Sequence, residues 1–442
     1  MTQVNVNMKL RLPPVKAFRR ALAISLLIGV AVPASAQLDT TVNRLNISYT
    51  DYLAKVGKNN LGYIAQQFNL GIAEAGIEMA KVFPDPQINY GAYDIGQQRL
   101  GLGYGFSTGI GTTLELGGKR RARINLAQSQ SELMKTILQN YFRNLRADAT
   151  NVFLQALMQE NIFKVKISSY QSMKKLATSD SIRLKLGSIM EIDARQTDVE
   201  ARSMLNEAFQ SEADWKAAML QLGMMMGKQR FDTLFDAKGG FFKFDREFIL
   251  SDLITNAENQ RADLLVALRT KEVSQRSLEL AKANRVIDLG ISMGVSSTTV
   301  VTNFVAPTPS FSTVSGGVSI PLRLSNKYTG DLKAAEYTIQ QSEVLYQQVE
   351  LQIQTDVTTA FFNYLQGRKQ VKQFNTGLLE EAKRVFDGKV YSYQRGNTSL
   401  LEVLNAQRTY NDVRQSYYLT LFNYAVELVE LERASGIWDI DF

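Results

Sequence analysis

The residue types missing from this chain limit the chemistry open to it. Its 442 residues include neither cysteine nor histidine. Without them, a zinc or copper enzyme site and any Ser-His or Cys-His nucleophile arrangement are effectively excluded. Disulfides and a lipidated N-terminal cysteine are excluded as well. We therefore predict no catalytic residues, no cofactor, no metal site and no enzyme activity.

Carboxylates are the groups left that can act on ions, and two of them recur in one pattern. Asp193 follows Gly187 by six residues, and Glu402 follows Gly396 by six residues. A ring of carboxylates around a narrow opening attracts cations and sets selectivity. What these two acids can do therefore depends on the elements that carry them.

The chain also contains a predicted strand with two unlike faces. Between Leu100 and Leu116, alternate positions are apolar, aromatic or threonine, and five of the positions between them are glycine. Side chains on a strand point to opposite faces with period two. An apolar face backed by a nearly bare face is typical of a strand that touches lipid outside and lines a curved lumen inside. No later segment has 18 uninterrupted apolar residues, so a membrane crossing by the mature chain would require a closed barrel.

Residues 1–36 are predicted to be an export signal. A basic stretch without acidic residues precedes the apolar run Ala21–Ala31, and Ala34-Ser35-Ala36 supplies a cleavage pattern. The apolar run is about half of the roughly 20 residues that span a bilayer, which disfavours an anchoring helix. This segment carries five of the seven net positive charges. The mature chain is therefore close to neutral, and we expect no nucleic-acid partner.

The mature chain is a tandem duplication. Asp148 and Thr150 recur 208 positions later as Asp356 and Thr358, and a row of apolar residues at intervals of four recurs with the same shift. The predicted repeats are residues 37–227 and 248–436. A linker at 228–247 joins them, and a short tail follows at 437–442.

Each repeat is predicted to contain a helix, a strand pair and a long helical hairpin. Proline and glycine are absent from 119–186, which allows one helix of roughly 100 Å. An extended coiled coil is the alternative for the helices considered alone. The expected ranges are 49–82, 87–116 and 118–226 in the first repeat, and 248–283, 286–324 and 327–434 in the second.

Together these features resemble the TolC-type outer-membrane efflux protein family, over essentially all of residues 45–436. The most specific local match is Leu114–Arg123, which is similar to the strand exit of family members, especially those of the heavy-metal efflux branch. A second match is the hairpin-tip pattern of a glycine followed six residues later by an acid.

The resemblance implies a membrane α+β fold. Three copies would share one barrel, each giving four transmembrane β-strands for twelve in all, and the helical hairpins would form a periplasmic tunnel. Four strands cannot close a barrel alone, which independently requires an oligomer.

The resemblance also implies an outer-membrane channel that conducts substrates passively, with its helical part in the periplasm. The implied partners are two further copies in a homotrimer, outer-membrane lipid, a periplasmic adaptor (membrane fusion) protein and an inner-membrane pump of RND or ABC type. The alternative from another class is a structural or adhesive coiled-coil protein of the cell envelope. The four two-faced strands distinguish the two, because an adhesive stalk does not need them.

The resemblance further assigns roles to particular residues. Asp193 and Glu402, three copies of each, are expected to ring the aperture. Arg395 and Tyr393 are expected to tie neighbouring helices there by hydrogen bonds and ion pairs. The adaptor-contacting turns would be Gly187 with Ser188 and Gly396 with Asn397, and the strand-to-helix junction would comprise Gly117, Gly118, Lys119 and Arg120. The simpler alternatives differ by group. The aperture residues would be solvated residues of the tip without a gating role, and the glycines of the turns would be ordinary helix caps. The basic residues of the junction would be anchors at the membrane interface.

Overall fold

The computed structural model describes residues 43–95, 102–228, 232–241, 245–302, 304–322 and 327–440. These ranges belong to one compact unit, Asn43–Phe442. The predicted export signal, Leu100 and Leu324 lie outside the described residues.

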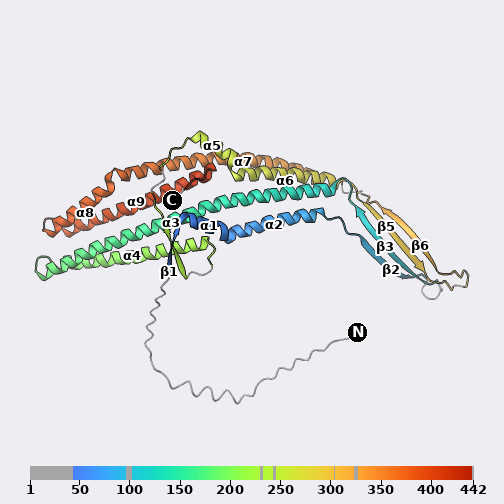
Figure 1. Ribbon diagram of the computed structural model, residues 1–442, viewed down its shortest axis with the longest axis horizontal. Coiled ribbons are helices and arrows are strands. Elements are labelled where there is room, and N and C mark those ends of the chain that lie inside the picture. The colour runs from blue at the N-terminus through green and yellow to red at the C-terminus, as the bar shows by residue number, and fades with distance from the viewer. Residues whose placement is uncertain are drawn as a thin grey trace, which may run out of the picture. The chain divides into compact units, whose positions relative to one another are not determined.

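Four helices lie side by side next to the strands. Their order is α2 (Leu61–Lys81), α3 (Lys119–Lys185), α6 (Ala262–Asn284) and α7 (Thr329–Gln373), each packed on the next (Figure 1). Toward the hairpin turns, α4 (Glu191–Met225) and α9 (Leu400–Ser435) both pack on α3, and α8 (Leu379–Gln394) packs on α9. This layer has α2 at one edge and α7 at the other. Among the described residues, no helix combines the length and apolar character that a membrane span requires.

The two long helices differ from each other. In the first repeat, α3 runs for 67 residues without interruption. The second repeat was expected to contain one helix up to Gly396, and that prediction is wrong. A π-helical turn at Phe374–Leu378 separates α7 from α8, because Gly377 has a φ of 105° inside it. Only glycine adopts such a backbone at little cost, so the helix cannot continue through this residue.

The shorter helices at 49–82 and 248–283 are also broken where we expected continuity. Asn60 separates α1 (Tyr49–Asn59) from α2, and Arg261 separates α5 (Leu250–Gln260) from α6. Both residues have an extended backbone, with ψ of 121° and 123°. The sequence pattern missed these breaks because neither contains glycine or proline.

At each break, the break residue contacts the C-terminal end of the helix that closes the hairpin of the same repeat. Asn60 Nδ2 donates to the carbonyl of Met225 in α4 at 3.0 Å, and Arg261 Nη1 donates to the carbonyl of Ala434 in α9 at 3.3 Å. Carbonyls of a helix's last turn lack intrahelical partners, so these donors satisfy them. A Cβ on Gly227 would lie 2.2 Å from the carbonyl oxygen of Asn59, so only glycine allows this approach. Each repeat thus has an equivalent joint, at Asn60 in the first repeat and at Arg261 in the second.

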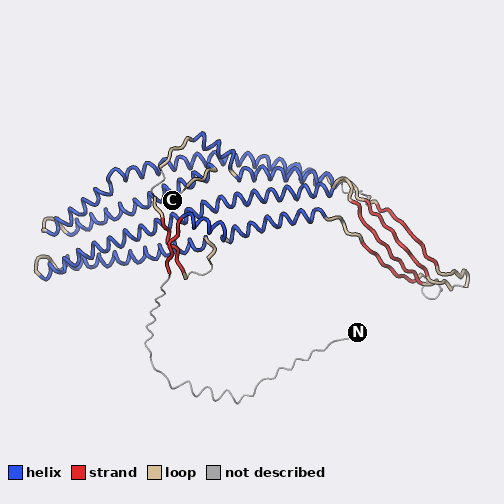
Figure 2. The backbone as a smooth tube through the Cα atoms, in the orientation of Figure 1, coloured by secondary structure: helices blue, strands red, loops and turns tan. Residues whose placement is uncertain are grey.

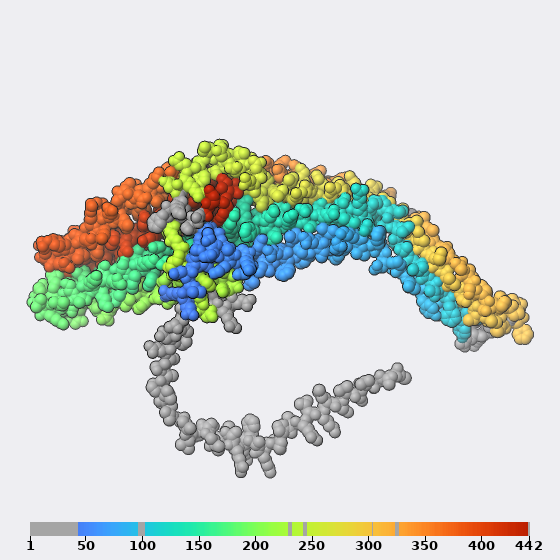
Figure 3. All heavy atoms as spheres, viewed as in Figure 1, coloured from blue at the N-terminus to red at the C-terminus, as the bar shows by residue number. Residues whose placement is uncertain are grey.

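The membrane-type strands form one antiparallel sheet in the order β2-β3-β5-β6. Figure 2 shows it continuing from the ends of the helices, and in Figure 3 no described helix covers its visible face. The row Tyr90, Thr108, Val295 and Val314 crosses the sheet on one face, whereas Asn89, Gly109, Gly294 and Ser315 cross it on the other. The strands are β2 (Gln87–Asp94), β3 (Tyr104–Leu114), β5 (Leu289–Thr298) and β6 (Phe311–Ser319).

A second, two-stranded sheet was not anticipated from the sequence. β1 (Asn43–Ser48) pairs in parallel with β4 (Thr233–Lys238), which lies inside the segment we expected to be a linker. Each strand is only six residues long, too short for a clear alternating pattern. The pairing ties the start of the described chain to the segment between the repeats.

The main core lies where α1, α3, α5, α7 and α9 meet. Tyr52, Phe153, Ile353, Val357 and Leu431 are among its fully buried members. Small residues of α3, which include Ala147 and Ala149, are also fully buried and let helices approach closely. A smaller core, with Met173, Leu176, Leu400 and Val403, lies near the hairpin turns.

Candidate functional site

The two hairpin turns have the same backbone structure. Gly187 and Gly396 adopt left-handed conformations, with φ of 72° and 79°. At the first turn the amides of Gly187 and Ser188 donate to the carbonyls of Leu184 and Arg183, both at 2.9 Å. At the second, the amides of Gly396 and Asn397 donate to Tyr393 and Ser392 at 2.9 and 3.0 Å. This double hydrogen bond is the Schellman ending of a helix, which requires a left-handed residue.

Tyr393 joins the two hairpins of one chain just inside these turns. Its hydroxyl donates to Asp180 Oδ2 of α3 at 3.2 Å, and both side chains are buried. Arg183 completes the contact: its Nη1 lies 3.4 Å from Asp180 Oδ1, and its guanidinium stacks over the Tyr393 ring at 5.1 Å. We call Asp180, Arg183 and Tyr393 the tip cluster. It holds α8 against α3.

Burial dominates the electrostatics of the tip cluster. Burial raises the pKa of Asp180 above its ordinary value, although hydrogen bonds from Tyr393 and Arg183 oppose the shift. Burial and the nearby carboxylate raise the pKa of Tyr393 to about 12, so its hydroxyl keeps its proton at neutral pH and serves as donor. Asp180 and Arg183 were not found from the sequence. They lie seven and four residues before Gly187, and no spacing in the sequence connects them to Tyr393.

The two acids expected at the aperture occupy equivalent positions but have different surroundings. Asp193 is the third residue of α4, and Glu402 is the third residue of α9. Asp193 has no ion-pair partner within the described part of the chain. Glu402 is exposed and pairs with Lys389 of α8, whose hydrogen bond lowers the pKa of its carboxyl group. A single chain therefore leaves one acid without a counter-charge and partly neutralises the other.

Arg395 is separate from the tip cluster. It is exposed, it caps the C-terminus of α8, and its guanidinium stacks at 4.0 Å over the ring of Tyr391 in that helix. Whereas Tyr393 forms a hydrogen bond with α3, Arg395 makes no ion pair with a described residue of its own chain.

The strand-to-helix junction is held by an ion pair whose lysine is buried. After β3, Gly117 and Gly118 both have left-handed backbones, with φ of 70° and 71°, and α3 begins at Lys119. Lys119 is 6% exposed, and its Nζ lies 2.6 Å from Oδ1 of Asp288, just before β5. The same carboxylate oxygen accepts the amide of Leu116 at 3.2 Å. This pair therefore fixes the first repeat's junction to the second repeat's strand.

Arg120 and Arg123 fasten the same junction to the end of α2. Arg120 Nε donates to the carbonyl of Lys81 at 2.8 Å, and its guanidinium stacks over Phe83. Arg123 forms a two-pronged contact with Glu115, at 2.7 and 3.1 Å, and also donates to the carbonyls of Ala80 and Val82. These contacts use the guanidinium as a planar fork, the geometry to which arginine is suited.

Comparisons with known proteins agree with this geometry. Residues 253–437 match the family model described as outer membrane efflux protein. The cobalt-zinc-cadmium resistance protein CzcC of Cupriavidus metallidurans is 23% identical over 367 residues, which cover 83% of this chain and 84% of that protein.

Solved structures show the same fold. The CusC structure, from a study of folding and transmembrane channel formation, has a TM-score of 0.70 at 16% identity and covers 88% of this chain and 92% of its own. The CmeC outer membrane channel of Campylobacter jejuni has a TM-score of 0.69 at 14% identity, with 88% and 85% covered.

A two-faced sheet that continues into long paired helical hairpins, with this match, defines an outer-membrane channel protein. Residues 253–437 carry an outer membrane efflux family domain, which confirms the resemblance seen in the sequence. The chain is an efflux channel of the outer membrane, and the family whose model it matches is one of efflux channels rather than enzymes.

Proposed function

We propose that three copies of this chain form one channel, with a twelve-stranded barrel in the outer membrane and a helical tunnel in the periplasm. The observation that carries this proposal is the four-stranded sheet, whose edge strands β2 and β6 have no further partner among the described strands. Unpaired edges expose backbone donors and acceptors that a membrane cannot satisfy. Pairing β6 of one copy with β2 of the next removes every edge.

The helical layer supports the same assembly. Its edge helix α2 exposes Phe68 and Ile72, and its other edge helix α7 exposes Tyr337 and Val344. Exposed apolar rows on two opposite edges favour packing against further copies. The purified protein should therefore run as a trimer in mild detergent. A stable monomer with intact strands would contradict the proposal.

The sheet also offers a matched test of which face meets lipid. Ile110 is 51% exposed on the apolar face of β3, and the adjacent Gly111 lies on the face of small residues. Ile110→Asp should impair assembly, because a charge facing lipid near the midplane costs about 2–4 kcal/mol for basic side chains and somewhat less for acids. Gly111→Asp should be tolerated, since that face is proposed to line the lumen. Equal amounts of trimer from both variants would show that the faces are wrongly assigned.

We further propose that the hairpin turns form the periplasmic aperture, where an adaptor and an inner-membrane pump of the RND or ABC class dock. Asp193 is proposed as the main cation-attracting group, because Glu402 is already paired with Lys389. In planar bilayers, Asp193→Asn should weaken cation selectivity more than Glu402→Gln. Asp198→Asn is the control, since Asp198 pairs with Arg202 one helical turn away. Unchanged selectivity in the Asp193 variant would remove this residue from the pore.

The tip cluster is proposed to hold the aperture closed. Tyr393→Phe removes the hydrogen bond to Asp180, a bond to a charged group of the kind that contributes about 1.5–3 kcal/mol. We expect a higher single-channel conductance. Tyr391→Phe is the matched control, because Tyr391 is 54% exposed and contacts Arg395 instead. Equal conductance in the two variants would limit the tip cluster to a structural role.

For the cargo we propose divalent transition-metal cations, on the basis of the likeness to a cobalt-zinc-cadmium resistance protein. Deleting the protein from its host should raise sensitivity to zinc, cobalt or cadmium, and the intact chain should restore tolerance. Increased sensitivity to hydrophobic drugs alone would identify a different cargo and would leave the channel assignment intact.

A further inference from the structure

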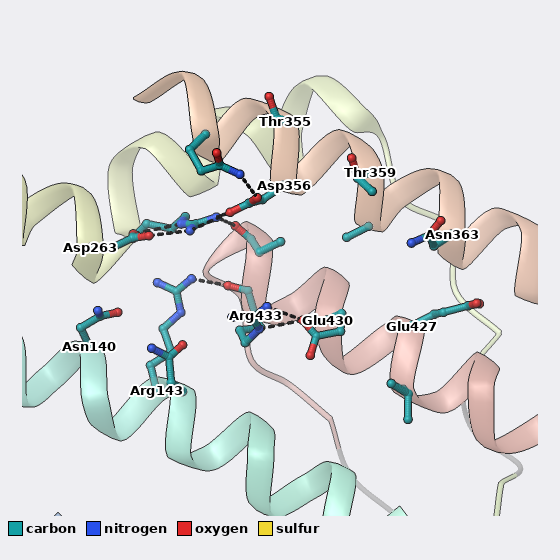
Figure 4. Close-up of a pocket in the computed structure, with 16 residues that line it drawn as sticks. Asn140, Arg143, Asp263, Thr355, Asp356, Thr359, Asn363, Glu427, Glu430 and Arg433 are labelled. Carbon is teal, nitrogen blue, oxygen red and sulfur yellow. Dashed lines mark hydrogen bonds and ion pairs between the residues drawn. The ribbon is translucent and has the colours of Figure 1, made fainter. Parts of the chain in front are cut away.

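A polar cavity of about 580 Å³ lies among α3, α6, α7 and α9, close to the joint at Arg261 (Figure 4). Amide and hydroxyl side chains from α3 and α7 contribute much of its wall. These neutral side chains are Asn140, Asn144, Gln352, Thr355, Thr359 and Asn363. The volume is in the range that binds small molecules.

Three guanidinium groups reach this cavity, and two of them have carboxylate partners. Arg261 pairs with Asp263 and Asp356, and Arg433 pairs with Glu430. Arg143 makes no ion pair with any described residue. Its Nη2 donates to the carbonyl oxygen of Arg433, and its Nη1 is buried without a hydrogen-bond partner.

The surroundings of Arg143 disfavour its positive charge. Burial lowers the pKa of this guanidinium to about 10, and the charges of Arg261 and Arg433 act in the same direction, although Asp263 opposes them. A buried donor and charge without a partner cost free energy that a bound group of opposite charge recovers. Figure 4 shows the Arg143 guanidinium directed toward the interior, beside the paired Asp263.

We propose that this cavity binds a small anion, an oxyanion or carboxylate, through Arg143 and the neighbouring amide and hydroxyl donors. A guanidinium forms strong, charge-assisted hydrogen bonds with such groups, and Nη1 of Arg143 is the nitrogen without a partner that can donate one. The site would be a property of the helical part of the channel, separate from the aperture and from the cation cargo.

Most acids of the cavity are paired with arginines and so do not oppose anion binding. The remaining acid makes anion binding depend on pH. Asp263 and Asp356 on the α6 and α7 side are paired with Arg261, and Glu430 of α9 is paired with Arg433. Glu427 of α9 is the remaining acid, and its Oε2 is buried without a hydrogen-bond partner. Burial raises the pKa of Glu427 to about 7. Protonation below this pH removes a negative charge from the wall, so anion binding should strengthen as the pH falls through neutrality.

The test uses the full-length protein purified in detergent and sulfate as the probe, because sulfate does not titrate near neutral pH. Isothermal titration with sulfate, against chloride at equal ionic strength, should show saturable binding. Arg143→Gln should weaken it by about tenfold or more, and Arg143→Lys should retain part of the affinity because the charge remains. Arg276→Gln, which removes an exposed arginine of α6 paired with Glu279, should bind like the wild type.

A second measurement separates site binding from the general effect of sulfate on stability. Sulfate should raise the unfolding temperature of the wild type more than that of Arg143→Gln, and Glu427→Gln should bind equally well on both sides of pH 7. Absence of saturable binding would overturn the proposal. So would a sulfate-independent loss of trimer in Arg143→Gln, because that result would place a carboxylate of a second copy against Arg143.

Discussion

The two repeats have the same backbone conformation at their hairpin turns but different side-chain contacts at their joints. Both turns place a left-handed glycine after the outgoing helix and make the same pair of amide hydrogen bonds. At the joints, the first repeat uses the neutral amide of Asn60, whereas the second uses Arg261 with two carboxylates. A helix ending constrains the backbone, so the glycine is retained. A carbonyl only needs a donor, and an amide or a guanidinium can supply one.

The difference has a consequence for stability. Asn60 caps α2 through the amide of Tyr63 and reaches one carbonyl of α4. Arg261 reaches the carbonyl of Ala434 and is also the partner of Asp263 and Asp356, with its own side chain 9% exposed. The second joint therefore depends on charge, and the first does not.

Removing the donor at each joint should give the largest difference between the repeats. Arg261→Ala removes the ion-pair partner of two carboxylates and should cost about 3 kcal/mol. This is near the lower end for a buried pair, because both acids keep some contact with water and one other hydrogen bond each. Asn60→Ala removes a cap and a neutral hydrogen bond and should cost about 1 kcal/mol. Thermal unfolding of the detergent-purified protein, followed by helical circular dichroism, measures both. Equal losses would mean that the charges at the second joint add nothing.

The same joint should respond to acid. Burial acts to raise the pKa of Asp263, but the hydrogen bond and charge of Arg261 outweigh it, and the pKa lies below its ordinary value. The carboxylate therefore contributes stability that is present above the unfolded-state pKa of about 3.9 and is lost as the pH falls through the lower folded-state value. In Arg261→Ala this contribution should disappear, so its stability should depend less on pH in that acidic range. Asn60→Ala should keep the wild-type acid dependence.

The sequence predicted the elements whose signals are long and periodic. The 67-residue α3 follows from uninterrupted helix-forming residues, and the two faces of β3 follow from glycine at alternate positions. The joints were missed because Asn60 and Arg261 break a helix by ψ alone, and neither residue is a glycine or a proline. The β1–β4 pair and the tip cluster were missed for another reason: Asp180 and Tyr393 are 213 positions apart, and only the folded helices bring them together.

The interruption of the second long helix at Gly377 should give a smaller difference in stability between the repeats, and it can be tested against a matched glycine in the same hairpin. Gly377→Ala places a Cβ on a backbone with φ of 105° and should cost about 1–2 kcal/mol, although no neighbouring atom lies within 4 Å of that position. Gly388→Ala in α8 is the matched control. It meets no neighbour either, but its backbone is helical, so it should gain roughly 0.5–1 kcal/mol. If both variants become more stable, the π-helical turn has straightened, and the two long helices are alike after all.

The smallest expected effect is at the residues that precede the two long helices. Gly118 caps α3 with φ of 71°, and Tyr328 caps α7 with φ of 54°, so the second repeat holds a tyrosine in a left-handed conformation. An L side chain pays about 1 kcal/mol there, and glycine does not. Gly118→Ala should therefore destabilise the protein by about that amount, because the added Cβ meets no atom within 4 Å and the backbone alone decides the result. Tyr328→Gly should change stability less, since relief of the backbone is offset by the contacts that Tyr328 makes. The unfolding temperatures of the two variants test this asymmetry. A loss in Tyr328→Gly that exceeds the loss in Gly118→Ala would show that the tyrosine side chain, rather than the turn, holds the second junction.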